Sequence, residues 1–487
     1  MGMKTATTAI DQKKIEEIVR RVLGENNQHQ DSQYVHLINE AHNMNGREGV
    51  FFTIDEAVAA ARQSYQQWRA VPLEKRYQII ETIREISRVN AVELAEMAVK
   101  ETGIGRKECK VNKNLLVADK TPGPELLKPI VFSGDHGLTL VERAPFGVIA
   151  SITPTTNPAA TIINNTISIL SAGNSVVYNV HPRAKNVSLF LIQLLNRTIV
   201  SAGGPANMLT TISNPTVESA QILMTHPGID LLLVTGGTEV VKFAIHSGKR
   251  AICAGPGNPP TVVDETADIE KAAHDILSSC GFDNNLVCSD EKEVFVAQAV
   301  ANQLKASMSS QGAYEINPSD LSKLEKVIFA EMGAPGKPGK MNPKWVGQDA
   351  ALILREAGFN ADDRVRVILA EVPFEHPLVW TEQMMPVLPL VRVRDVDEGI
   401  QYALNAEHGF HHTAVMHSFS LASLNKMARV MDTAIFVKNA PSYSGLGFEG
   451  EGYTSFSIGT KTGEGLTTCL TFTRERRCAL VDYFRIV

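Results

Sequence analysis

Apolar residues between about 50 and 102 recur every three or four positions, a spacing that predicts a run of amphipathic helices. Thr53-Ile-Asp-Glu56 has the form of a capping box, so we expect a helix to begin there and to extend to about Trp68. Further helices are expected over 73–88 and 90–102, the last of them ended by Gly103.

After Pro145 the pattern changes to short, branched apolar runs separated by helical segments. Gly147–Thr153 and Ser175–Asn179 have the length and branching of buried strands, and residues 158–171 between them predict a helix. The alternation continues to a strand over Asp230–Val234. This order predicts an α/β fold with a parallel sheet, whose ligands bind at the carboxyl ends of the strands.

A second α/β unit begins near Ala254, with strands expected over Thr261–Asp264 and Glu293–Ala297 and a helix over 267–279. Residues 311–350 are richer in Gly, Pro and Lys, which favours a long surface excursion. Outside both units, Leu138–Ala144 alternates as a strand does, and Leu466–Val487 predicts a strand and tail.

The first residues carry a separate pattern. Residues 10–24 predict a short amphipathic helix, and the polar stretch Glu25–Gln33 that follows is typical of a linker. The apolar stripe of the helix comprises Ile15, Ile18, Val19, Val22 and Leu23. Such a helix is marginal alone. It either docks on a partner groove or folds back on its own body or oligomer.

Composition narrows the class of protein. The 487 residues are 44% apolar and 21% charged, with a net charge of −6, which gives no electrostatic basis for binding nucleic acid. We expect no membrane association, because no apolar run reaches spanning length and no signal-peptide core is present. The six cysteines form no CxxC pair and no zinc spacing with His, so we expect reduced thiols in a cytoplasmic enzyme and no metal.

One cysteine lies in a setting suited to chemistry. Cys288 follows a predicted helix in the loop Gly281-Phe-Asp-Asn-Asn-Leu-Val-Cys288, whereas Cys280 and Cys253 lie in apolar elements. A thiol nucleophile needs a lowered pKa and a donor for the oxyanion that it creates. Asn157, after a buried strand, carries an amide donor, although an Asn-Pro pair is also a common turn. Thr235-Gly-Gly-Thr238 also follows a strand and can face phosphate with its backbone N–H groups.

Taken in order, these motifs resemble the aldehyde dehydrogenase superfamily. The motifs are Thr153-Pro-Thr-Thr-Asn157-Pro158, Thr235-Gly-Gly-Thr238, Ala254-Gly-Pro-Gly-Asn-Pro-Pro260, the Cys288 loop and Glu382-Gln-Met-Met-Pro386. Within that superfamily the chain resembles the CoA-acylating branch found in ethanolamine and propanediol microcompartments. The resemblance implies a Rossmann-like NAD-binding domain, an α/β catalytic domain and a small oligomerisation arm.

The implied organisation has five parts. They are a targeting helix over 1–24, a linker over 25–47, a dinucleotide-binding domain over 48–253 with its arm at about 124–145, a catalytic domain over 254–455, and a C-terminal oligomerisation segment over 456–487 that can return to the arm. The chain is accordingly expected to form a homo-oligomer and, through residues 10–24, to bind a shell protein inside a bacterial microcompartment.

The resemblance also implies roles for individual residues. Cys288 corresponds to the nucleophile, Asn157 to the oxyanion donor and Glu382 to the glutamate that holds the nicotinamide ribose. The cofactor-binding positions are Thr153, Pro154, His181, Pro182, Thr235, Gly236, Gly237, Thr238 and Glu382. NAD is favoured over NADP, although His181 replaces the family's usual lysine. His412 matches a histidine of this branch whose role is left open.

The residue at position 254 distinguishes the hydrolytic branch of the superfamily from the CoA-acylating branch. Hydrolytic relatives carry at this place a glutamate that activates water, whereas alanine can neither accept nor give a proton. The expected reaction therefore converts a short-chain aldehyde, propionaldehyde or acetaldehyde, to acyl-CoA with NAD and coenzyme A, which use one adenosine pocket in turn. A hydrolytic dehydrogenase and a catalytically silent shell-binding scaffold remain as alternatives.

Overall fold

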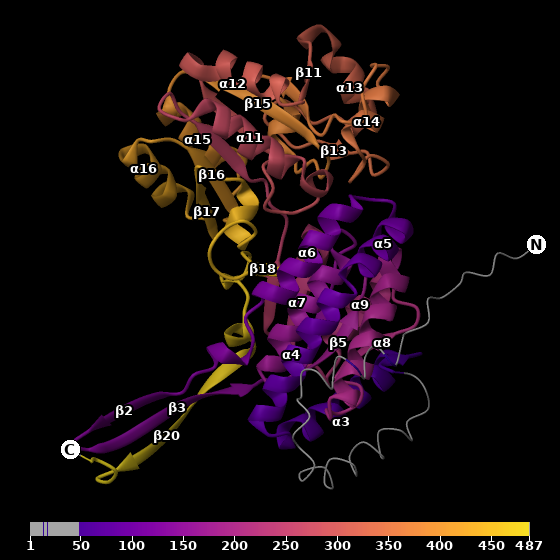
Figure 1. Cartoon of the computed structure of the whole chain (residues 1–487), viewed down its shortest axis with the longest axis vertical. Coiled ribbons are helices and arrows are strands. Elements are labelled where there is room, and N and C mark those ends of the chain that lie inside the picture. Colours follow the sequence, from indigo (N-terminus) through magenta and orange to yellow (C-terminus); the bar gives the residue numbers. More distant parts are fainter. Residues whose placement is uncertain (1–12, 14–16, 18–47, 487) are drawn as a thin grey trace, which may run out of the picture.

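The structure is a computed structural model that describes residues 13, 17 and 48–486 (Figure 1). The predicted targeting helix over 10–24 and the linker over 25–47 therefore lie outside the described residues, apart from Lys13 and Glu17. In the remainder of the chain, two lobes built on parallel sheets are joined near the middle, and a long arm extends from one of them (Figure 1).

The first lobe is a parallel sheet covered by helices on both faces, as the βαβ alternation predicts. Its strands run in the order β1 (Val50–Phe51), β6 (Leu209–Ile212), β5 (Ser175–Asn179), β4 (Val148–Ile152), β7 (Leu231–Thr235) and β8 (Ala251–Ala254). Its helices are α3 (Ile54–Ala70), α4 (Leu73–Val89), α5 (Ala91–Thr102), α6 (Lys107–Lys120), α7 (Pro158–Ser171), α8 (Lys185–Ser201), α9 (Val217–Thr225) and α10 (Thr238–His246).

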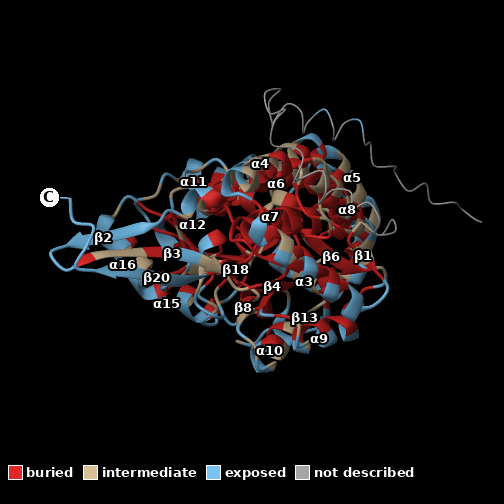
Figure 2. Cartoon of the chain, turned by 90° about the horizontal axis from the view of Figure 1, so that it is seen from below, coloured by how far each residue is buried: buried red, intermediate tan, exposed pale blue. Residues whose placement is uncertain are grey.

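Alternate residues of each central strand enter different cores. In β4, Ile149 packs with α4, α7 and α8, whereas its neighbours Val148 and Ala150 pack with α3, α9 and α10. Both cores consist of buried apolar residues, and Figure 2 shows the buried residues gathered around the central strands. The period of two along the strand therefore fixes which helices cover which face.

The predicted helix boundaries are confirmed where local signals are strong. Thr53 caps α3 with the full reciprocal capping box to Glu56. Helix α5 ends at Gly103, which adopts the left-handed conformation with φ 70°. These ends depend on contacts within one turn of the chain, so the sequence alone specifies them.

The second lobe repeats the architecture. Its parallel strands run in the order β11 (Tyr314–Ile316), β14 (Ile368–Glu371), β15 (Val387–Val393), β10 (Glu293–Ala297), β9 (Pro260–Val263), β16 (Thr413–His417) and β17 (Ile435–Lys438). Its helices are α11 (Ile269–Cys280), α12 (Gln298–Ser310), α13 (Leu321–Ile328), α14 (Ala350–Glu356), α15 (Val396–Ala406) and α16 (Leu421–Met431).

The surface excursion expected over 311–350 is wrong in its main point. This segment contributes β11 to the sheet, then α13 and the antiparallel pair β12 (Phe329–Glu331) and β13 (Lys340–Met341). Leu324, Ile328 and Trp345 are buried in a core of their own with α14. The Gly- and Pro-rich turns marked the ends of these short elements, and their composition concealed the apolar residues between them.

The arm is a three-stranded antiparallel sheet of β2 (Ile130–Gly134), β3 (Gly137–Pro145) and β20 (Thr473–Val481). Thr473 pairs with Pro145 and Val481 with Gly137, so the C-terminal strand returns along the whole of β3. Figure 1 shows the arm projecting away from both lobes. The predicted return of the last segment to the arm is confirmed, although the strand itself covers only 473–481.

The chain passes from the first sheet to the second between β8 and β9, so the loop after Ala254 lies where the lobes meet. Among the described residues, no helix is both long enough and apolar enough to cross a membrane.

Candidate active site

One large cavity, of about 860 Å³, opens at the carboxyl ends of β4, β5, β7 and β8 and reaches the loop before β10. Its lining includes eleven of the residues that the sequence singled out: Thr153, Pro154, Asn157, His181, Pro182, Thr235, Gly236, Gly237, Ala254, Cys288 and Glu382. Thr238, the first residue of α10, and His412 are not among the lining residues. Because the strands are parallel, their carboxyl ends bring these distant segments to one edge.

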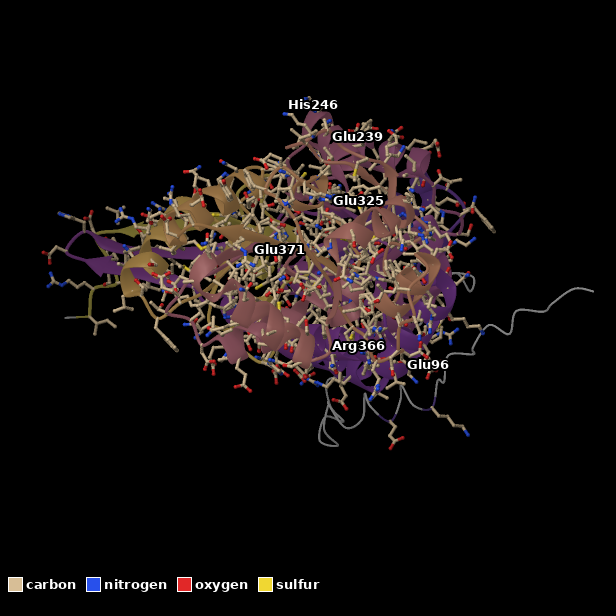
Figure 3. All side chains as sticks on the ribbon, turned by 90° about the horizontal axis from the view of Figure 1, so that it is seen from above. Glu96, Glu239, His246, Glu325, Arg366 and Glu371 are labelled. Carbon is tan, nitrogen blue, oxygen red and sulfur yellow. The ribbon has the colours of Figure 1, made fainter. Side chains whose placement is uncertain are left out.

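The outer part of the cavity lies between α9 and α10. It is lined by apolar side chains that include Val217, Met224 and Phe243. Glu239 and His246 stand on its rim, and Figure 3 shows both at the edge of the molecule. A flat apolar slot of this kind suits an adenine ring.

Backbone groups and unpaired hydroxyls lie next to that slot. Gly237 is the N-cap of α10, and the first N–H groups of such a helix can bind an anion such as a phosphate. Within the described part of the chain, the buried hydroxyls of Thr153 and Thr155 have no hydrogen-bond partner. Burial lowers the pKa of His181, whose neutral ring accepts a hydrogen bond from the N–H of Arg183 at 3.1 Å. These groups fit a dinucleotide or another adenosine phosphate.

Cys288 lies at the inner end of the cavity, in a loop with a strained backbone. Asp283, Asn284 and Asn285 all have positive φ, at 46°, 59° and 63°. Left-handed conformations of non-glycine residues are costly and persist only where side-chain contacts hold them. Burial, together with the Glu382 carboxylate, raises the pKa of the Cys288 thiol to about 12, although Lys292 opposes the rise. The sequence led us to expect a lowered thiol pKa, so that expectation is wrong.

Asn157 is the N-cap of α7, but its side chain makes no capping hydrogen bond. Its Oδ1 instead accepts a hydrogen bond from Nζ of Lys113, which reaches it from α6. Since an ammonium group can only donate, this contact identifies the amide oxygen and leaves Nδ2 as the donor at the cavity wall.

Three buried lysines of this region were missed by the sequence reasoning: Lys110, Lys113 and Lys292. Lysines on a helix usually face solvent, yet Lys110 and Lys113 are 3% and 2% exposed. Their ammonium groups converge on the carboxylate of Asp283. The available signal was their spacing with Val117, which places all three on the buried face of α6.

Ala254 ends β8 and is nearly buried, 5% exposed, in the wall that also carries Cys288. Burial raises the pKa of Glu382, whose Oε1 accepts from the N–H of Gly257 at 3.4 Å. His412 lies behind this turn, and its Nδ1 is 2.9 Å from Oγ1 of Thr413. Burial, with repulsion from Lys292, lowers the pKa of His412 to about 4, so the ring is neutral.

A strand-end cavity with a loop cysteine, an amide donor and an apolar slot beside a helix N-terminus suits an oxidoreductase that acts on carbonyl groups. Residues 41–315 match the aldehyde dehydrogenase family, and the chain belongs to that family.

The individual proteins that this chain is similar to are described more specifically than the family. It is 48% identical over 479 residues to an acetylating acetaldehyde dehydrogenase of Salmonella typhimurium, covering 98% of this chain and 100% of the relative. A propionaldehyde dehydrogenase of Rhodopseudomonas palustris with bound CoA and an acylated cysteine is 47% identical, with a TM-score of 0.86 over 89% of this chain and 98% of that one. A propionaldehyde dehydrogenase from the fucose utilisation microcompartment of Clostridium phytofermentans is 45% identical, with a TM-score of 0.87 over 90% of this chain and 100% of that one.

Proposed function

We propose that the protein is a CoA-acylating aldehyde dehydrogenase that converts acetaldehyde or propionaldehyde to the acyl-CoA with NAD and coenzyme A. The observation that carries the proposal is one cavity that joins Cys288, Asn157 and an alanine at position 254. The named relatives, at 45–48% identity over 89% or more of the chain, support the same reaction.

The chain's own residues account for the first step. Cys288 releases its proton to solvent and its sulfur attacks the aldehyde carbon, so that a carbon–sulfur bond forms and the carbonyl oxygen becomes an oxyanion. Nδ2 of Asn157 and the N–H of Cys288 donate to that oxygen. NAD, when bound, accepts the hydride and its two electrons from the carbon, which leaves a thioester on Cys288.

The second step transfers the acyl group. The thiolate of coenzyme A attacks the thioester, and Cys288 leaves as a thiolate ready for the next turnover. Water would need a positioned base, which contributes about 10²- to 10⁴-fold. Ala254 offers none, whereas a thiolate attacks without such help.

The slot between α9 and α10, the α10 N-terminus and the hydroxyls of Thr153 and Thr155 are the groups proposed to hold the adenosine phosphate of either molecule. Because both carry an adenosine phosphate, they are proposed to occupy this slot in turn. Glu382 is proposed to hold the ribose next to the reacting ring.

Absorbance of NADH tests the function directly. With aldehyde, NAD and CoA, we expect sustained NADH and acyl-CoA production that Cys288→Ala abolishes and Cys280→Ala does not. Without CoA, we expect one NADH per active site and then slow turnover. Equal sustained rates with and without CoA would instead assign the protein to the hydrolytic branch.

Assembly is part of the proposal. The arm carries exposed apolar residues, with Ile130, Val131 and Phe132 each more than half exposed, which suit contact with a second copy of the chain. We propose a homo-oligomer built through this arm and the segment over 456–487. We also propose that residues 10–24 bind a shell protein and direct the enzyme into a microcompartment. Sedimentation of the full-length protein and of a chain lacking 474–487 tests the first point.

A further inference from the structure

Two buried ammonium groups lie behind the two proposed oxyanion donors. Lys113, on α6, donates to Oδ1 of Asn157, whose Nδ2 is the first donor. Lys292 is fully buried, and its Nζ donates to the carbonyl oxygen of Val287 at 3.3 Å. That carbonyl belongs to the peptide unit whose N–H is the N–H of Cys288, the second donor. Each donor amide is thus held by a lysine at its oxygen.

Hydrogen bonds in series polarise one another, and more strongly where water is excluded. An ammonium at an amide oxygen draws electron density from the nitrogen, so the amide N–H becomes a stronger donor. We propose that Lys113 and Lys292 are positioning residues that orient and polarise the two oxyanion donors, Asn157 Nδ2 and the N–H of Cys288. This inference rests on the proposed function, because only attack on a carbonyl carbon creates the oxyanion.

Lys113 is held in place by the Cys288 loop itself. Its ammonium contacts Oδ2 of Asp283, and Oδ1 of the same carboxylate accepts from the N–H of Arg106 at 2.6 Å. Lys110, one turn earlier on α6, donates to Asp283 and to the carbonyl of Thr156, at 3.0 Å each. With both lysines charged, this cluster carries one more positive than negative charge. Lys110 touches the same loops without contacting the side-chain amide of Asn157, so it is the matched control.

The ammonium group of Lys292 contacts neutral oxygen atoms instead of a carboxylate. Its Nζ donates to the backbone oxygen of Asn285 at 3.0 Å, to Oδ1 of the same residue and to the Val287 carbonyl. All three acceptors are neutral, so these contacts leave the positive charge uncompensated.

The positive charge of Lys292 favours the Cys288 thiolate, whereas other groups near Cys288 disfavour it. Burial raises the pKa of Asp290 well above the usual range, and the His412 ring is neutral. Glu382 disfavours the thiolate and Lys292 favours it. Lys292 therefore bears on both the thiolate and the donor next to it, whereas Lys113 bears on the Asn157 donor.

The test for Lys113 is a double-mutant cycle on the NADH burst, measured with saturating aldehyde and NAD and without CoA. Asn157→Ala is expected to slow the burst by about 10²- to 10³-fold. Lys113→Gln is expected to slow it by about 10- to 100-fold, and the double variant no further than Asn157→Ala alone. Lys110→Gln is expected to lower thermal stability with a smaller effect on the burst.

Losses that multiply in the double variant, or a Lys113→Gln burst at the wild-type rate, overturn the assignment of Lys113. If Lys113→Gln does not fold, Lys113→Met, which matches the length of the stem, takes its place in the cycle. A wild-type protein without any NADH burst would count against the proposed function, whereas a wild-type burst with a failed cycle counts against this inference alone.

The test for Lys292 adds alkylation of Cys288 by iodoacetamide at pH 8, a reaction that forms no oxyanion. Lys292→Gln is expected to slow the burst and also the alkylation, by tenfold for each unit that the thiol pKa rises. Lys113→Gln is expected to leave alkylation within about twofold of wild type. A folded Lys292→Gln variant with normal burst and normal alkylation overturns its assignment, and so does a loss of alkylation in both lysine variants alike.

Discussion

At the scale of single residues, the site depends on a thiol that the protein keeps protonated. Burial and the Glu382 carboxylate hold the pKa of Cys288 at about 12, well above the 8.5 or so of a free cysteine. The cavity therefore keeps the sulfur mainly in its thiol form, and Lys292 is the neighbouring group whose charge favours the thiolate.

This raised pKa predicts the pH dependence of alkylation in the enzyme without nucleotide. Below the folded pKa the thiolate fraction rises tenfold per pH unit, so the rate should rise about 100-fold from pH 7 to pH 9 without a plateau. A free thiol levels off near its own pKa. Mass spectrometry of Cys288 after timed iodoacetamide exposure measures the rate. A plateau near pH 8.5 would contradict the raised pKa.

Ala254 gives the second residue-scale prediction. In Ala254→Glu, a carboxylate in the wall shared with Cys288 can take a proton from water, so free acid and NADH should form without CoA. The expected gain in CoA-independent turnover is about tenfold or more. Gas chromatography of the acid, with Ala254→Gln as the uncharged control of matched size, separates base catalysis from altered packing. An equal gain in both variants would refute the explanation.

At the scale of elements, the sequence predicted those features that depend on near neighbours. The capping box at Thr53, the stop at Gly103 and the branched strand β4 were all found at the expected positions. Prediction failed where contacts over long distances decide. The helix lysines of α6 are buried because Asp283, 170 positions later for Lys113, supplies their counter-charge. The core under α13 likewise forms against elements that come later in the chain, including α14, β14 and β15.

The turn between β8 and β9 offers an element-scale prediction. A Cβ added at Gly257 would lie 2.8 Å from the carbonyl oxygen of Cys288 and 3.0 Å from Cγ of His412. The backbone oxygen cannot yield without moving the nucleophile, so Gly257→Ala should reduce kcat by about tenfold or more. Circular dichroism checks the fold. Gly134→Ala is the control for substitution, because an added Cβ meets nothing there and its φ is not positive. Normal kcat in Gly257→Ala would show that the turn can relax.

At the scale of the whole molecule, the cavity and the segments proposed for assembly occupy separate parts of the chain. The cavity lies where the two sheets meet, the arm projects from the body (Figure 1), and the predicted targeting helix precedes residue 48 in the sequence. Among the described residues, the lining of the cavity begins at Ile152, so we expect removal of residues 1–24 to spare catalysis.

Deletion of residues 1–24 should therefore leave kcat within about twofold of the full chain and abolish recruitment to a protein shell. The apolar stripe from Ile15 to Leu23 is the physical reason, since it offers a groove the anchor residues of an amphipathic helix. Co-purification with shells, beside solution kinetics, measures both effects. A full-length variant with Ile18 and Val22 changed to Ser is the control. Loss of activity or of the oligomer on deletion would place the helix in the enzyme's own body.

The large cavity also constrains the order in which its ligands bind. If one slot accepts both adenosine phosphates, the reduced dinucleotide must depart before the acyl acceptor can enter, and during that interval the acyl group waits on Cys288. A side chain at position 254 that cannot act as a base then affects the lifetime of the thioester as much as the choice of acyl acceptor. A thioester that water destroyed faster than the two molecules exchange would waste every aldehyde that the enzyme had already oxidised.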